Sequence, residues 1–171
     1  MVVLRPTRKL QSVLPTTAVS AQSDTALGDW YVNRVIVDRR PLLLLVSSTS
    51  LLPILLPARD VARLPDRIAT LVESRLQRCG VNRHLIAAEL RAMQQVAIAP
   101  TIDRSVLGIM VDFARAVLYY LEPGQWTGET LTLVEDRLAE TPCHAARSHD
   151  RVIFPNRKAP EVLRTKWLAS Q

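Results

Sequence analysis

Two acidic residues, Asp29 and Asp112, stand where a carboxylate could take part in chemistry. Asp29 precedes a segment rich in aromatic and β-branched residues, and Asp112 lies in the middle of a long apolar segment. Paired carboxylates can act on sugar or phosphate substrates when the fold brings them within about 10 Å of each other. The sequence therefore allows a small enzyme, provided that these two residues meet in the folded chain.

Asp112 also belongs to a polar stripe within residues 103–122. Its members recur at steps of three and four, which places them on one side of a helix: Ser105, Gly108, Asp112, Arg115, Tyr119 and Glu122. This stripe either lines a binding groove or faces water. Because the rest of the helix is apolar, we expect the helix to be largely enclosed by the fold. Asp112 should then be half-buried and bonded near Trp30 or Asn33, since a buried carboxylate needs donors.

Cysteine and histidine cluster once, at Cys143, His144 and His149. Their spacing matches no common zinc module, and a structural zinc site needs four ligands. The other cysteine, Cys79, is distant in sequence and forms no CxxC pair. We therefore expect no metal, no cofactor, no catalytic residue of this kind and a reducing, cytoplasmic environment.

The chain carries a formal charge of +6, and all but three of its 22 basic residues are arginine. This surplus fits phosphate or carboxylate recognition, although the codon usage of a GC-rich genome gives the same composition. A basic cluster lies near the C-terminal end: Arg147, Arg151, Arg157 and Lys158. Because Phe154 and Trp167 accompany it, a nucleic-acid-binding accessory factor is one alternative function.

The length of 171 residues and the hydrophobic content of 48% are typical of one globular domain. We expect residues 1–26 to form a short strand, a basic turn and a polar linker, and residues 27–171 to form the domain. Residues 41–58 are uncharged over nearly the length of a membrane span. Three prolines and an interruption of sequence SSTS favour buried strands there, so no membrane association is expected.

The order of the predicted elements favours an α+β fold, because strands precede most of the helices. Residues 30–56 read as a three-stranded meander, in which Pro53 indicates an edge strand. Further short strands are expected near residues 2–4 and 96–100, and helices are expected at residues 66–79, 83–95, 103–122, 128–141 and 159–169. We thus predict a small antiparallel meander sheet of about three to five strands, packed against four or five helices with one long central helix near 103–122.

Three stretches carry a resemblance: LGDWYVN at 27–33, the SVLG-M-D pattern within 103–114, and AETPC at 139–143. Together they resemble a family of small bacterial proteins catalogued only as a domain of unknown function, over residues 27–168. The chain departs from that pattern at Val111, where the family has Asn, and at Cys143, where it has Met. The resemblance implies a small cytoplasmic protein with no established activity. The residues that match its motif positions are Asp29, Trp30, Asn33, Gly108 and Asp112.

The predicted function is a non-catalytic intracellular protein-interaction or regulatory domain that binds a protein partner or associates with itself. The sequence contains neither a GxGxxG motif nor a Walker loop, and its apolar segments exceed what one small sheet covers. The candidate binding residues are Asp29, Trp30, Asn33, Asp112, Arg115 and Tyr119. The nucleic-acid-binding factor and a small enzyme that uses Asp29 and Asp112 are the alternatives.

Overall fold

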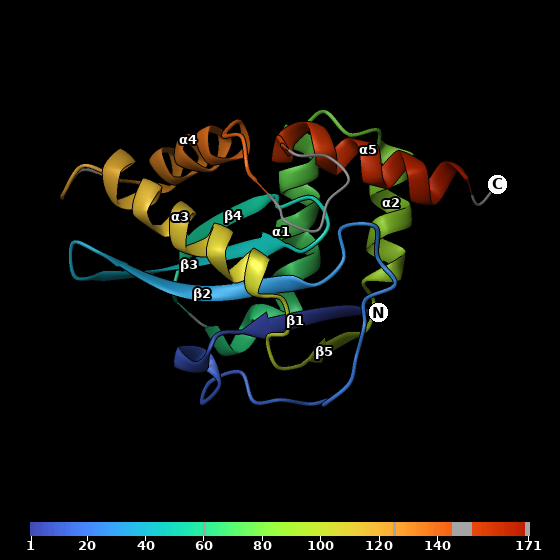
Figure 1. The fold of residues 1–171 in the computed structure, drawn as a ribbon, viewed down its shortest axis with the longest axis horizontal. Helices are drawn as coiled ribbons and strands as arrows, with labels where there is room; N and C mark the ends of the chain where they lie inside the picture. Colours follow the sequence, from blue (N-terminus) through green and yellow to red (C-terminus); the bar gives the residue numbers. More distant parts are fainter. Residues whose placement is uncertain (60, 125, 145–151, 170–171) are drawn as a thin grey trace.

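A computed structural model describes residues 1–59, 61–124, 126–144 and 152–169 of the chain, and Figure 1 shows their arrangement. Five strands form one mixed sheet in the order β4-β3-β2-β1-β5. Their bounds are β1 Val2–Pro6, β2 Trp30–Val37, β3 Arg40–Ser47, β4 Pro53–Pro57 and β5 Val96–Ile98. The α+β prediction is confirmed, but the sheet is mixed and not purely antiparallel, because β1 runs parallel to both of its neighbours.

Five α-helices cover this sheet, and most of them lie where the periodicity predicts. They are α1 Leu64–Arg78, α2 Arg83–Ala92, α3 Arg104–Tyr120, α4 Gly128–Ala139 and α5 Pro155–Leu168. Gly80, with a φ of +68°, follows the end of α1 in the left-handed conformation common after helices. The side chains of Asn82 and Asp103 cap α2 and α3 by accepting hydrogen bonds from the backbone N–H groups of His84 and Ser105.

The start of α5 differs from the prediction, which placed it at residue 159. The helix begins at Pro155, a favourable first position for proline, and continues through Pro160. Pro160 cannot donate the usual backbone hydrogen bond and would ordinarily interrupt a helix. Ala159 and Leu163 are nevertheless completely buried on either side of it, so packing against the domain outweighs the lost hydrogen bond.

The predicted meander of β2, β3 and β4 is confirmed by two antiparallel ladders. Asp38 and Arg39 form the turn between β2 and β3, and both have positive φ angles, which suit a two-residue hairpin turn. Pro53 opens β4 at the edge of the sheet, where a residue without an N–H is tolerated. The edge strand that Pro53 indicates in the sequence is therefore β4.

The N-terminal strand β1 lies inside the sheet, between β2 and β5, and all five of its residues are buried. The segment after it, which the sequence suggests is a mobile linker, is held by hydrogen bonds. Thr17 exchanges hydrogen bonds with the backbone of Ile98, and the Ser23 hydroxyl accepts one from the Val3 N–H. Strand β1 is thus part of the same sheet as β2.

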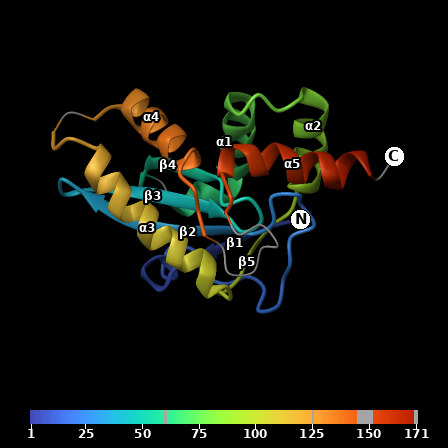
Figure 2. The same cartoon turned by 45° about the horizontal axis from the view of Figure 1, so that its top comes forward.

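Helices pack on both faces of the sheet, and the pleat of β3 shows how. Leu43 and Leu45 point toward α1, α2 and α5, whereas Leu42 and Leu44 point toward α3 and α4. Both faces of β3 are therefore buried, which explains why its sequence is apolar without interruption. In Figures 1 and 2, α3 and α4 lie side by side over β2–β4.

Both edges of the sheet are covered. On the β4 edge, the Glu135 carboxylate of α4 accepts a hydrogen bond of 2.6 Å from the Leu55 N–H. On the β5 edge, Thr17 and Ala18 donate hydrogen bonds to the carbonyl of Ile98. Exposed edges invite pairing with other chains, so these contacts protect the sheet.

Residues 41–58, the apolar stretch considered as a membrane span, form most of β3 and all of β4. Within the part of the chain that the structure describes, none of the helices combines the length and hydrophobicity that a membrane crossing requires.

Candidate functional site

Asp29 lies at the entrance to β2 and is held in an ion pair with Arg5 of β1. The Arg5 side chain is 2% exposed, and the remaining donors of its guanidinium reach the carbonyls of Pro100 at 2.5 Å and Ala21 at 2.7 Å. The second oxygen of Asp29 accepts hydrogen bonds from the backbone and hydroxyl of Ser23. The carboxylate thus anchors the N-terminal segment to the sheet.

The neighbouring motif residues also serve the fold. Trp30 is completely buried in the core beneath α1, α2 and α5. Asn33 accepts hydrogen bonds from the Thr7 hydroxyl and from the Arg34 backbone, so it fixes the start of the segment after β1. The LGDWY motif therefore marks the junction of the first two strands.

Asp112 does not lie where its sequence context predicts. Its side chain is 69% exposed, and its ion pair at 3.7 Å joins it to Arg115, one turn later on α3. The expected contact with Trp30 or Asn33 is wrong, because α3 is less enclosed than its apolar content suggests. Two of its apolar residues, Val111 and Leu118, are themselves exposed.

The polar stripe therefore faces water, and so do some of the apolar residues of α3. Gly108, Asp112, Arg115, Tyr119 and Glu122 are all exposed, and Ser105 is partly so. Tyr119 is 85% exposed. Among the described residues, Asp29 and Asp112 share no hydrogen-bond or ion-pair partner, so the arrangement offers no support for two-carboxylate chemistry.

The basic cluster near the C-terminal end is only partly described, since Arg147 and Arg151 lie outside the described residues. Arg157 stacks on the ring of Phe154, with 5.0 Å from its guanidinium carbon to the ring centroid. Lys158 forms an ion pair of 2.8 Å with Glu161. Acid thus offsets part of the charge on which the nucleic-acid alternative depends.

Cys143 is a buried thiol in the short bridge with Ile153 that precedes α5. Burial, and to a lesser degree the nearby Asp112 carboxylate, raises its pKa to about 11. A thiol with this pKa stays protonated near neutral pH and is a poor nucleophile. His149 lies outside the described residues; within them, no three His, Cys, Asp or Glu side chains gather to hold a metal.

Two buried glutamates were missed by reasoning from the sequence. Glu89 of α2 accepts hydrogen bonds from the Ala26 and Leu27 backbones and from the Trp167 indole. Glu135 of α4 accepts from Leu55 and pairs with Arg78. Burial raises the pKa of both carboxyl groups, while their hydrogen bonds oppose that rise. The sequence contains one signal for this burial. Each glutamate lies four residues after a buried leucine and therefore on the same side of its helix.

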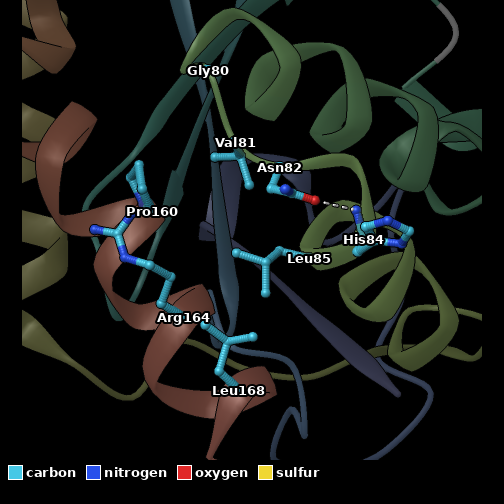
Figure 3. Close-up of a pocket in the computed structure, with 8 residues that line it drawn as sticks. All are labelled: Gly80, Val81, Asn82, His84, Leu85, Pro160, Arg164 and Leu168. Carbon is cyan, nitrogen blue, oxygen red and sulfur yellow. Dashed lines mark hydrogen bonds between the residues drawn. The ribbon is translucent and has the colours of Figure 1, made fainter.

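A hollow of about 450 Å³ was also missed, and Figure 3 shows it between the start of α2 and α5. The α2 side contributes Gly80, Val81, Asn82, His84 and Leu85, and the α5 side contributes Pro160, Arg164 and Leu168. In Figure 3, Val81 and Leu85 face α5 across the hollow, whereas His84 lies beyond Asn82. Sequence periodicity could not reveal it, because its walls come from residues far apart in the chain.

Residues 3–158 match the model of a protein family described as Domain of unknown function (DUF6933). The chain belongs to this family. No curated protein and no solved structure is detectably similar to it.

The family match extends farther toward the N-terminus than the resemblance predicts, and it includes most of β1 together with Arg5. It ends within α5, four residues into the helix. The α5 wall of the hollow, formed by Pro160, Arg164 and Leu168, thus lies beyond the matched residues.

Proposed function

We propose that this protein is a non-catalytic interaction domain that associates with a second copy of itself. The observation that carries the proposal is a group of large apolar side chains exposed on adjoining helices. This α3–α4 surface consists of Val111, Leu118 and Tyr119 on α3 and Leu133 on α4, all between 47% and 85% exposed. Large contiguous exposed apolar patches mark protein-association sites.

The composition of the α3–α4 surface supports this role. Tyr119 stacks edge-on against Tyr120, and Arg137 of α4 lies over the Tyr120 ring. A shallow hollow of about 170 Å³ lies between the two helices, lined in part by Tyr120 and Leu133. Tyrosine and arginine are enriched among the residues that dominate binding energy at protein interfaces.

The charges on α3 favour a second copy as the partner. Asp112 and Arg115 are adjacent and mostly exposed, so the surface presents one acid and one base. Two copies related by a two-fold axis place the same patch against itself. Asp112 of each copy can then pair with Arg115 of the other, and electrostatic complementarity fixes the register.

Light scattering after size-exclusion chromatography tests the proposal. Wild-type protein should have a mass near twice 19.1 kDa at high concentration, whereas Leu118→Asp should be monomeric. Val19→Asp is the matched control, because Val19 is also exposed but lies on the N-terminal segment. A wild-type protein that stays monomeric at every concentration would refute self-association.

A charge exchange provides the sharper test. Arg115→Asp should weaken the dimer, since it places acid against Asp112 of the other copy. Adding Asp112→Arg should restore association if the two residues pair across a two-fold axis. Equal dissociation constants for the single and double variants would contradict this arrangement.

Nucleic-acid binding is the second candidate, and the β2–β3 hairpin favours it. Arg34, Arg39 and Arg40 are exposed at this hairpin and form no ion pair within the described residues. Phosphate contacts would make binding fall steeply as salt increases. Fluorescence anisotropy with DNA and RNA at two salt concentrations tests it, and absence of binding at low salt rejects it.

A cytoplasmic location fits both candidates. Cys79 and Cys143 are free thiols, and disulfides are rare in reducing compartments. Fractionation of cells that express the tagged protein tests this proposal, and recovery from an exported fraction would contradict it.

A further inference from the structure

The hollow between α2 and α5 has the dimensions and wall chemistry of a small-molecule site. Its volume of about 450 Å³ lies within the usual range for ligand pockets. Val81 and Leu85 line one side, and Pro160 and Leu168 line the other. Leu168 is more than half exposed, so the opening of the hollow is apolar as well.

One cation stands at the wall of this apolar hollow. In Figure 3, the Arg164 side chain runs along α5 toward Pro160 on the α5 side of the hollow, and the residue is exposed. No acidic side chain among the described residues forms an ion pair with Arg164. The nearest acid on its own helix, Glu161, pairs instead with Lys158 at 2.8 Å.

Asn82, another polar residue at the hollow, serves the fold. The Asn82 side chain accepts a hydrogen bond of 2.8 Å from the His84 backbone and so caps α2. The buried Glu89 carboxylate, one turn beyond Leu85, is taken by two backbone N–H groups and the Trp167 indole. Arg164, which forms no ion pair within the described residues, consequently has the capacity to bind an anion at this hollow.

We propose that this hollow binds a small carboxylate that carries an apolar chain. The carboxylate pairs with the Arg164 guanidinium, whose planar fork matches it in geometry. The apolar chain lies between Leu85 and Leu168 and displaces water from both walls. This site is separate from the α3–α4 surface, so it does not depend on the proposed self-association.

Titration with octanoate, followed by ¹⁵N–¹H NMR of the full chain, tests the proposal. Amide signals of Val81, Leu85 and Leu168 should shift in a saturable manner. 1-Octanol has the apolar chain without the charge, and acetate has the charge without the chain. Both should bind at least about tenfold more weakly than octanoate, because each lacks one of the two contributions.

Arg164→Gln should weaken octanoate binding about tenfold or more, the loss expected for one charge-assisted contact. Arg91→Gln is the matched control, because Arg91 is an exposed arginine near the opposite end of α2. Its dissociation constant should equal that of the wild type. Leu168→Asp should also abolish binding, and an unchanged spectrum elsewhere confirms that each variant is folded.

Three results would overturn the assignment. Octanoate that produces no saturable shifts at these amides excludes the site. Equal binding of octanoate and 1-octanol removes the role of charge, and unaltered binding by Arg164→Gln removes the role of Arg164.

Discussion

Arg5 and Asp29 form an ion pair in the interior of the protein, where β1 and β2 run side by side. The pair joins the first strand to the entrance of the second and also holds Ala21 and Ser23 of the segment between them. An acid that resembles a catalytic candidate in the sequence thus serves as an anchor in the fold.

Asp29→Ala should destabilise the domain by about 3 kcal/mol or more, because it leaves the Arg5 charge buried without its partner. Asp112→Ala should change the free energy of unfolding by less than about 0.5 kcal/mol, since its ion pair is exposed. Urea denaturation of both variants measures the difference. Equal losses of stability would contradict the contrast between the two carboxylates.

The sequence located most elements because local signals specify them. Caps at Asn82 and Asp103, the glycine after α1 and the uninterrupted leucines of β3 each act within a few residues. The parallel insertion of β1 between β2 and β5 could not be derived in this way. Its register depends on contacts between residues 2–4 and residues 96–98, and a five-residue apolar strand contains no signal for its partner.

The candidate site was harder to predict than the fold. Counting apolar residues around α3 overestimated its burial, because only one broad side of the helix meets the sheet. Conversely, the burial of Glu89 and Glu135 is not expected from their residue type, because acidic residues on helices usually face water. Their burial depends on donors from distant segments, such as Leu27 and Leu55.

Gly28 and Gly108 should respond to alanine in opposite directions. Gly28 has a φ of +72°, and an added Cβ would lie 2.4 Å from the Ser48 hydroxyl oxygen. Ser48 accepts a hydrogen bond from the Asp29 N–H, so Gly28→Ala should cost about 2 kcal/mol through strain and a displaced hydroxyl. Gly108 lies exposed on α3 with open space around it, so Gly108→Ala should stabilise by about 0.5–1 kcal/mol.

Thermal or urea melts of the two glycine variants provide the measurement. If both substitutions destabilised the protein to a similar degree, the positive φ of Gly28 and its contact with the β3–β4 turn would not account for the effect.

Glu89 should make stability increase as pH falls from neutral toward its ordinary pKa of 4.5. Burial raises its pKa in the folded state, so the folded protein takes up a proton before the unfolded chain does. The stability that this group contributes is therefore fully present below 4.5 and is lost as pH rises through the folded-state pKa. Glu89→Gln cannot take up this proton and should lack that part of the increase.

Urea denaturation at several values between about pH 5 and pH 7 measures this effect. Glu135, whose pKa is raised in the same direction, is present in both proteins and cancels in the comparison. Identical pH slopes for the wild type and Glu89→Gln would contradict the assignment to Glu89.

The two thiols should react slowly with Ellman's reagent in the native protein and rapidly in denaturant. Burial raises the pKa of Cys79, and the pKa of Cys143 is raised to about 11, so little of either is the reactive thiolate at neutral pH. If the two thiols react at different rates, the Cys143→Ser variant shows which rate belongs to which thiol. Rapid modification of native Cys143 would show that its thiol is more accessible and acidic than the fold implies.

The position of β1 has a consequence for synthesis on the ribosome. Val2–Pro6 is translated before β5, at Val96–Ile98, which completes its pairing. Until then, one row of its backbone groups has no strand beside it, and an unpaired apolar strand is prone to aggregation. The growing chain must therefore keep β1 shielded until Val96–Ile98 has been translated, and a nascent chain stopped before β5 would need a chaperone.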